Sequence, residues 1–398
     1  MASAQPARQS SRIAGLDLAR AIAIAFAMVG HCFVHFGVWE LLAADTVVAL
    51  RAFVRSATPT FIILFGMMLE IVYLKMLRDG ERQGCWLRLI TRAIQCYLLY
   101  LCVVAAGVLG GQLAPLEGAK AALFLSGAYF ANILKFYSLG LVAGIALLEL
   151  RLRHGLRSIA GVAVVIWLAW PLVKALPPLP PSLSHLGSFL IGAGTVTGPS
   201  VLQGMTLAAL GMLLGHALLR GGAKLLVPLA LAALLPVGAL MATAGVGRTF
   251  ANFADYGFRA ANHPTYYLLG SAFALCIVAG CVALAPRLPR AALARLNVFG
   301  VSSLFAYGIG NVVLNLLPPL RDSLPLGLLA SVVFLACLYA MTAYFQQAVQ
   351  APAGGTPPRS PGARVARLHG RLRLMTMRLA GVFVVRLLSS GRPAREPV

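Results

Sequence analysis

Charge is scarce in this 398-residue sequence: only 11% of the residues are Asp, Glu, Lys or Arg, and 60% are hydrophobic. Soluble domains carry about 25% charged residues, so this composition excludes a water-soluble fold. Acidic residues are the scarcest, since 11 Asp and Glu stand against 33 Lys and Arg, and the formal net charge is +22. With a mean hydropathy of +0.85, the basic excess indicates loops that face anionic lipid rather than a nucleic-acid surface.

Regular repeats are lacking as well. The 40 Gly and 23 Pro are scattered among long apolar runs without a period, which excludes fibrous and disordered classes. A helix needs about 20 apolar residues to cross roughly 30 Å of hydrocarbon. Ten runs meet this need, at residues 14–37, 54–76, 93–112, 129–150, 158–176, 199–219, 224–244, 265–285, 296–318 and 325–347. The sequence therefore predicts an all-α integral membrane protein, a polytopic bundle of about ten transmembrane helices.

The basic residues decide the predicted orientation. With a cytoplasmic N-terminus, 24 of the 33 Lys and Arg fall in cytoplasmic segments and seven in outer segments. This asymmetry predicts that both termini are cytoplasmic. The predicted outer loops 176–198 and 245–264 are the longest stretches without a helix, and 119–132 is apolar enough for a re-entrant or interfacial piece.

The composition changes after residue 347. We divide the chain into a ten-helix transmembrane domain (1–347), a Pro/Gly-rich linker (348–362) and a basic cytoplasmic tail (363–398). Arginines interrupt every apolar stretch of 363–388, so this segment predicts an amphipathic helix on the inner leaflet and not an eleventh span.

Ionisable residues inside a span are functional candidates, because a charge within the bilayer is costly. Arg20 and His31 are eleven residues apart in the first predicted helix, so they share one face and are separated by about 16 Å. This places Arg20 near the cytoplasmic boundary and His31 near the midplane. Asp17 precedes Arg20 by three residues and can hold its guanidinium by an ion pair.

This face suits a transfer across the membrane. An arginine can dock a cytosolic anion, and an imidazole can take the proton of an incoming hydroxyl. The alternative is an interfacial Asp17–Arg20 ion pair and a His31 that only hydrogen-bonds a neighbouring helix. His35 follows one turn after His31, but no third ligand is evident, so no metal is expected.

The Arg20–His31 spacing, Arg-x10-His, is similar to the signature of the acyltransferase-3 superfamily of transmembrane acyltransferases. Arg88 and Arg92 resemble its Arg-x-x-x-Arg motif, and residues 300–307 (Gly-Val-Ser-Ser-Leu-Phe-Ala-Tyr) resemble its late Gly-x-x-Ser element. The resemblance covers about residues 12–347. One departure is that the middle-helix Trp-Ser-Leu-x-x-Glu element of the family is replaced by Tyr-Ser-Leu at 137–139, with no carboxylate following.

The resemblance implies acyl-CoA, commonly acetyl-CoA, as cytosolic donor and a glycan or lipid-linked sugar outside as acceptor. It implies a place in the bacterial plasma membrane. Arg20, Arg88 and Arg92 are then the candidates to bind the coenzyme A phosphates. Ser303 and Tyr307 share a helix face and are further donor-binding candidates; the alternative for both is helix packing.

Four other residues are candidate acceptor contacts. Glu70 lies near the cytoplasmic end of the second predicted helix, where it could also pair with an arginine such as Arg20. Asp255, Arg259 and His263 form a polar cluster in the loop 245–264; the alternative is that these three are solvated. Lys135 enters the fourth helix from the outer side and is expected to snorkel to the surface.

Two functions follow from these patterns. The first is an O-acyltransferase in which His31 acts as general base or as a transient acyl carrier. The second is a secondary transporter or flippase of a small anion or lipid-linked sugar that uses the same Arg/His face, although no paired broken helices in two related halves are visible.

Overall fold

The computed structural model describes residues 13–320, 323–350 and 360–390, and in these residues the only regular secondary structure is helical. Most of the predicted linker, residues 351–359, and the end of the tail, 391–398, lie outside the described residues. The elements are α1 (Ala14–His35), α2 (Val38–Leu41), α3 (Ala44–Arg55), α4 (Ala57–Met68), the π-helical turn η1 (Leu69–Tyr73), α5 (Leu74–Arg78), α6 (Arg82–Leu109), α7 (Pro115–Ala122), α8 (Asn132–His154), α9 (Leu156–Leu168), α10 (Trp170–Lys174), α11 (Pro181–Ile191), α12 (Val201–Gly221), α13 (Ala223–Ala244), α14 (Val246–Ala254), α15 (Tyr256–Ala260), α16 (Pro264–Leu284), the 3-10 turn η2 (Ala285–Arg287), α17 (Arg290–Leu296), α18 (Val298–Val301), α19 (Ser303–Leu316), α20 (Leu324–Gln350) and α21 (Pro361–Ser390).

Nine helical segments of the described residues are long and apolar enough to cross a membrane. They are Ala14–His35, Ala44–Arg78, Arg82–Leu109, Asn132–His154, Leu156–Lys174, Val201–Gly221, Ala223–Ala244, Pro264–Arg287 and Leu324–Gln350. Each coincides with one of the ten predicted runs. The all-α polytopic fold is thus confirmed.

The tenth predicted run, 296–318, is not one continuous helix. It is divided into the end of α17, the single turn α18 and the 14-residue α19. A helix of this length extends about 21 Å, less than the hydrocarbon thickness. Asn297 and Ser302 stand at the two breaks, and such side chains compete for backbone hydrogen bonds and favour helix ends.

Close approaches of small residues hold the centre of the bundle together. A Cβ at Gly66 of α4 would overlap the carbonyl oxygen of Ala208 in α12, and Gly211 of α12 lies equally close to Ile63. Gly300 in α18 lies against the carbonyl oxygen of Asp17 in α1 in the same way. Because these positions lack a side chain, the backbones meet as they do in small-residue membrane interfaces.

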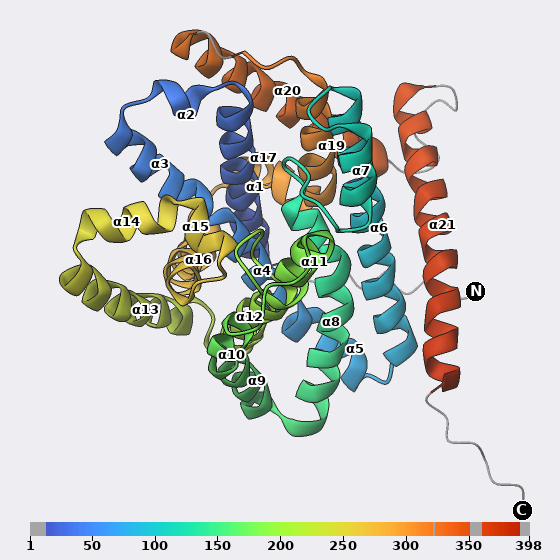
Figure 1. The fold of residues 1–398 in the computed structure, drawn as a ribbon. Helices are drawn as coiled ribbons and strands as arrows, with labels where there is room; N and C mark the ends of the chain where they lie inside the picture. The colour runs from blue at the N-terminus through green and yellow to red at the C-terminus, as the bar shows by residue number, and fades with distance from the viewer. Residues whose placement is uncertain (1–12, 321–322, 351–359, 391–398) are drawn as a thin grey trace, which may run out of the picture.

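Helix α1 occupies the middle of the molecule. It contacts α3, α4, α16, α18, α19 and α20, and Figure 1 shows it among these helices. His31 therefore lies on a helix that other helices surround on several sides.

Two predicted loops contain helices. The segment 176–198 includes α11, and 245–264 is mostly α14 and α15. The prediction of long non-helical stretches was wrong here because all three helices are short. Pro181 stands in the first turn of α11, where proline favours rather than breaks a helix.

The helix predicted at 363–388 is present as part of α21, which ends at Ser390, and its place on the inner leaflet stays a prediction. Helix α21 runs beside α6 and also contacts α20 (Figure 1). Ala380 and Val384 pack on Ile90, and Gln95 Nε2 donates a hydrogen bond to Thr376 Oγ1 at 3.2 Å.

Candidate functional site

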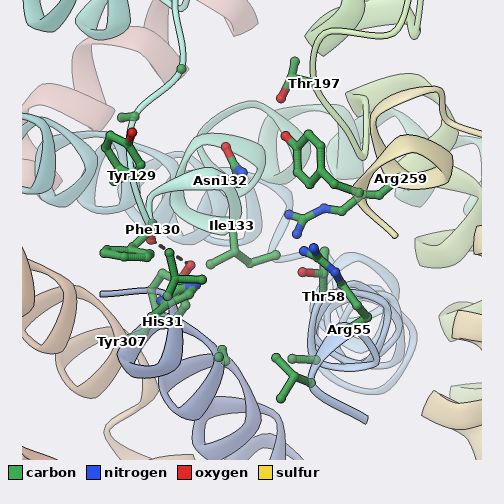
Figure 2. Close-up of a pocket in the computed structure, with 18 of the residues that line it drawn as sticks. His31, Arg55, Thr58, Tyr129, Phe130, Asn132, Ile133, Thr197, Arg259 and Tyr307 are labelled. Atoms are coloured by element: carbon green, nitrogen blue, oxygen red, sulfur yellow. Dashed lines mark hydrogen bonds between the residues drawn. The ribbon is translucent and has the colours of Figure 1, made fainter. Parts of the chain in front are cut away.

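A cavity of about 800 Å³ lies beside the C-terminal part of α1. Its walls come from α1, α2, α3, α4, α8, α11, α15 and α19, and from the loops between α6 and α7, between α7 and α8, and between α11 and α12. Of the predicted site residues, His31, Arg259 and Tyr307 line it, and Figure 2 shows all three pointing into the same space. Segments that are far apart in the sequence thus form one cavity.

His31 is held by three neighbours. Its Nδ1 lies 2.7 Å from Oδ1 of Asn311, a buried residue of α19. Its ring centroid is 4.7 Å from that of Phe130 and 5.8 Å from that of Tyr307. With the Nδ1 proton donated to the amide oxygen, the lone pair of Nε2 is left able to accept a proton.

Tyr307 fixes the backbone that covers His31. Its hydroxyl donates to the carbonyl oxygen of Phe130 at 3.0 Å. Phe130 has φ +59°, a left-handed conformation that is rare for a bulky residue and costs about 1–3 kcal/mol. The hydrogen bond from Tyr307 helps to hold this conformation, which places the Phe130 ring on the imidazole.

Arginines form the other side of the cavity. Arg51 and Arg55 come from α3 and Arg259 from α15. In Figure 2 the guanidinium groups of Arg55 and Arg259 point toward one another, across the cavity from His31. Arg55 Nε donates to the carbonyl of Ala254 at 3.3 Å, and Arg259 Nε donates to that of Gly198 at 2.9 Å.

Lys135 does not snorkel to the surface; that expectation was wrong. The side chain is buried, and its Nζ lies 2.7 Å from Nε2 of His185 and 4.2 Å from the ring centroid of Phe189. These contacts stabilise the Lys135 side chain inside the protein, and they replace the contacts that it would make with water at the surface. Burial and the neighbouring Lys135 charge lower the pKa of His185, which lines the cavity, from 6.5 to about 4.

Asp17 and Arg20 form the predicted ion pair, with Arg20 Nη1 2.9 Å from Asp17 Oδ1. Neither residue lines the cavity. Arg88 and Arg92 are exposed on α6, yet Arg20, Arg88 and Arg92 all lie within electrostatic range of the hydroxyl of Tyr73. The structure therefore gathers the three predicted phosphate-binding arginines in one region, away from the chamber of His31.

Glu70 lies in the π-helical turn η1 and is not part of the cavity. Its carboxylate accepts two hydrogen bonds from Arg151, from Nε at 3.0 Å and from Nη2 at 2.7 Å. Nδ1 of His216 lies 3.2 Å from the same carboxylate. The expected pairing with an arginine exists, but the partner is Arg151 rather than Arg20.

Three further candidates lie outside the cavity. Asp255 is exposed at the junction of α14 and α15. His263 caps the N-terminus of α16 through a hydrogen bond from the Thr265 backbone N–H to its Nδ1, at 3.2 Å. Ser303 begins α19, one turn before Tyr307.

Sequence reasoning missed Arg55, Asn311 and Phe130 as site residues. Arg55 is one of the seven Lys and Arg that the predicted orientation places in outer segments. Because basic residues are few on that side, its position was a signal that could have marked it as a site residue. Asn311 is an amide in an apolar run, four residues after Tyr307, where a search restricted to ionisable groups passes over it. For Phe130 the sequence offers no signal, because its place depends on a backbone conformation.

Among the described residues, no group of three His, Cys, Asp or Glu side chains is arranged to hold a metal ion. Comparisons of the chain with protein-family models, with curated proteins and with solved structures found no match.

Proposed function

We propose that this chain is an integral-membrane O-acyltransferase, as its resemblance to the acyltransferase-3 superfamily implies. One observation carries the proposal: the two segments that bear the first and last motifs touch at both ends. Gly300 packs against Asp17, and Tyr307 packs against His31. His31 and Tyr307, which belong to these two motifs, thus line one cavity that is large enough for a small substrate.

The proposed topology places both termini in the cytoplasm of a bacterial cell, in the plasma membrane. Arg20, Arg88 and Arg92 then lie on the cytosolic side and bind the phosphates of acyl-CoA as guanidinium forks. His31 is about 16 Å further along α1, toward the outer face. The acyl thioester extends along α1 to reach it, and a glycan or lipid-linked sugar approaches from outside.

In the general-base route, Nε2 of His31 takes the proton of an acceptor hydroxyl while the oxygen attacks the thioester carbonyl carbon. The C–S bond breaks, and the imidazolium returns the proton to the coenzyme A thiolate. In the relay route, Nε2 itself attacks the thioester carbonyl carbon, the C–S bond breaks and the coenzyme A thiolate leaves. The acceptor oxygen then attacks the acyl-imidazole, the C–N bond breaks, and the hydroxyl proton passes to the thiolate. The Asn311 contact at Nδ1 serves both routes because it orients the ring.

One observation favours a second candidate, an anion transporter. Among the described residues, three arginines and no Asp or Glu line the cavity, which is the charge pattern of an anion-binding path. A transporter would use this surface without cleaving a thioester.

The test is the release of coenzyme A. Purified protein in detergent is given labelled acetyl-CoA and a crude lipid-linked glycan fraction, and free thiol is measured with time. We expect release by the wild type, loss of release in His31→Ala, and unchanged release in the matched control His154→Ala, since His154 is exposed at the end of α8. Full turnover in His31→Ala would remove His31 from the mechanism. No turnover by the wild type, together with anion uptake into proteoliposomes, would favour the transporter.

A further inference from the structure

The arginines of the cavity have no acidic partner. The six ion pairs found among the described residues involve other side chains, and no Asp or Glu lines the cavity. Arg55 lies within electrostatic range of both Arg259 and Arg51. Like charges at such a site repel one another, and a bound anion would relieve this repulsion.

The hydrogen bonds of these arginines leave their outer donors available. Arg55 and Arg259 each use Nε on a backbone carbonyl, which anchors the guanidinium plane. Both also lie near the ring of Tyr256, with Cζ at 5.6 Å and 5.9 Å from its centroid. The Nε contacts therefore fix the position of each guanidinium group, and its terminal nitrogens point into the cavity (Figure 2).

Charge and geometry select the kind of anion. Two guanidinium groups carry two positive charges and can bind in forked pairs, which matches a phosphoryl group with nearly two negative charges and three oxygens better than a carboxylate with one charge. The hydroxyls of Thr58 and Thr197 line the same part of the cavity. They add neutral hydrogen-bonding groups that suit a sugar beside the phosphate.

We propose that Arg55 and Arg259 bind a phosphoryl group of the acceptor, whose sugar hydroxyl then faces His31 across the cavity. This inference rests on the proposed acyltransferase function and specifies its acceptor: a hydroxyl compound that carries a phosphate or diphosphate. The phosphate could belong to a lipid-linked sugar diphosphate or to a soluble sugar phosphate. Both share the chemistry that the arginines recognise.

The first measurement is binding of inorganic diphosphate to the full chain in a neutral detergent, by equilibrium dialysis with labelled probe. We expect saturable binding, and a dissociation constant at least about tenfold weaker in Arg55→Gln and in Arg259→Gln, because each loses a charge-assisted fork. Arg248→Gln is the matched control, since Arg248 is exposed on the neighbouring α14 and does not line the cavity. It should change the constant by less than about twofold.

A second variant covers the case in which glutamine prevents folding. Arg259→Lys keeps the charge but loses the fork, so its affinity should lie between those of the wild type and Arg259→Gln. Absence of binding in the wild type, or equal affinity in wild type and both arginine variants, would overturn the proposal. Glucuronate that competes as strongly as diphosphate would also overturn it, because the site would then select carboxylates.

Two further arms identify the source of the phosphate and separate this inference from the proposed function. The competition is measured in nanodiscs. If phosphatidylglycerol displaces the diphosphate and glucose 1-phosphate does not, the site binds a phospholipid headgroup and the acceptor proposal is overturned. Displacement by glucose 1-phosphate supports the proposal. The binding assay needs no acetyl-CoA. If diphosphate binding depends on Arg55 and Arg259 but acetyl-CoA is not cleaved, only the proposed acyltransferase function is contradicted. If acetyl-CoA is cleaved but diphosphate binding does not depend on these arginines, only the proposed acceptor site is contradicted.

Discussion

His31 and Asn311 are 280 residues apart in the sequence, yet Nδ1 of the imidazole lies 2.7 Å from Oδ1 of the amide. This hydrogen bond joins α1 to α19 at the wall of the cavity. It selects which ring nitrogen faces the substrate, because a proton shared with the amide at Nδ1 leaves Nε2 without one.

The first prediction concerns this bond. Asn311→Leu should lower kcat for coenzyme A release by about 10- to 100-fold with little change in KM, because the ring loses its orientation but the donor site is untouched. Asn311→Asp should retain more activity and move the acidic limb of the pH–rate profile to higher pH, since a carboxylate stabilises the imidazolium. Identical pH profiles in Asn311→Asp and the wild type would show that the residue acts only in packing.

The second prediction concerns the hydroxyl of Tyr307. Tyr307→Phe should lower the free energy of unfolding by about 1 kcal/mol and reduce turnover, because Phe130 loses the hydrogen bond that helps to hold its left-handed backbone. Tyr339→Phe is the matched control. Its hydroxyl also donates to a backbone carbonyl, that of Arg295 at 3.1 Å, but on the exposed surface and outside the cavity. An equal loss of turnover in both variants would contradict the role given to Tyr307.

The third prediction compares a buried ion pair with an exposed one. Glu70 and Arg151 have side chains only 2% and 7% exposed, so Glu70→Leu alone should destabilise the protein by about 3–5 kcal/mol by leaving an uncompensated charge. The double variant Glu70→Leu, Arg151→Leu should recover most of that loss. Lys120→Leu, which breaks the exposed pair with Glu117, should destabilise the protein far less than Glu70→Leu. The stabilities of the wild type and the three variants are compared by thermal unfolding in detergent. A double variant that is less stable than Glu70→Leu would contradict the prediction.

The fourth prediction concerns pH and His185. Burial and the adjacent Lys135 lower its pKa from 6.5 to about 4, so the folded protein keeps the imidazole neutral where the unfolded chain protonates it. The stability contributed by the neutral form is complete above about pH 6.5 and is lost as the pH falls toward about 4. Thermal unfolding should therefore show a steeper fall between pH 7 and pH 4.5 for the wild type than for His185→Gln. Parallel curves would show that His185 titrates normally in the folded state.

The sequence predicted what hydropathy controls. The nine long spans follow from apolar runs of sufficient length, and the basic helix of the tail follows from its interrupted pattern. The break at Ser302 was missed because residues 296–318 remain apolar on average, and hydropathy does not report a local change of backbone direction. The short helices α11 and α14 were missed for the opposite reason, since they are not long enough to form an apolar run.

Of the residues singled out in the sequence, His31, Arg259 and Tyr307 line the cavity, and Arg259 lies across it from His31. The sequence predicted an arginine partner for Glu70 but suggested Arg20, because the observed partner Arg151 is 81 residues away and only the fold brings them together. Asn311 and Phe130 depend on the same kind of long-range contact. Such pairings are decided by helix packing, and that is not visible in any single segment.

The helices at the edge of the bundle have their own consequence. In the most apolar windows of Leu156–Lys174, Ala223–Ala244 and Leu324–Gln350, only 11%, 17% and 22% of residues are buried within the protein. Their side chains meet acyl tails, which accept one aliphatic group as readily as another. Exchanges among Leu, Val, Ile and Ala on these three helices should thus leave the stability of the protein nearly unchanged. We expect natural sequence variation to be largest there. Constraint is concentrated instead where α1, α4, α12 and α19 leave no room for an added methyl group.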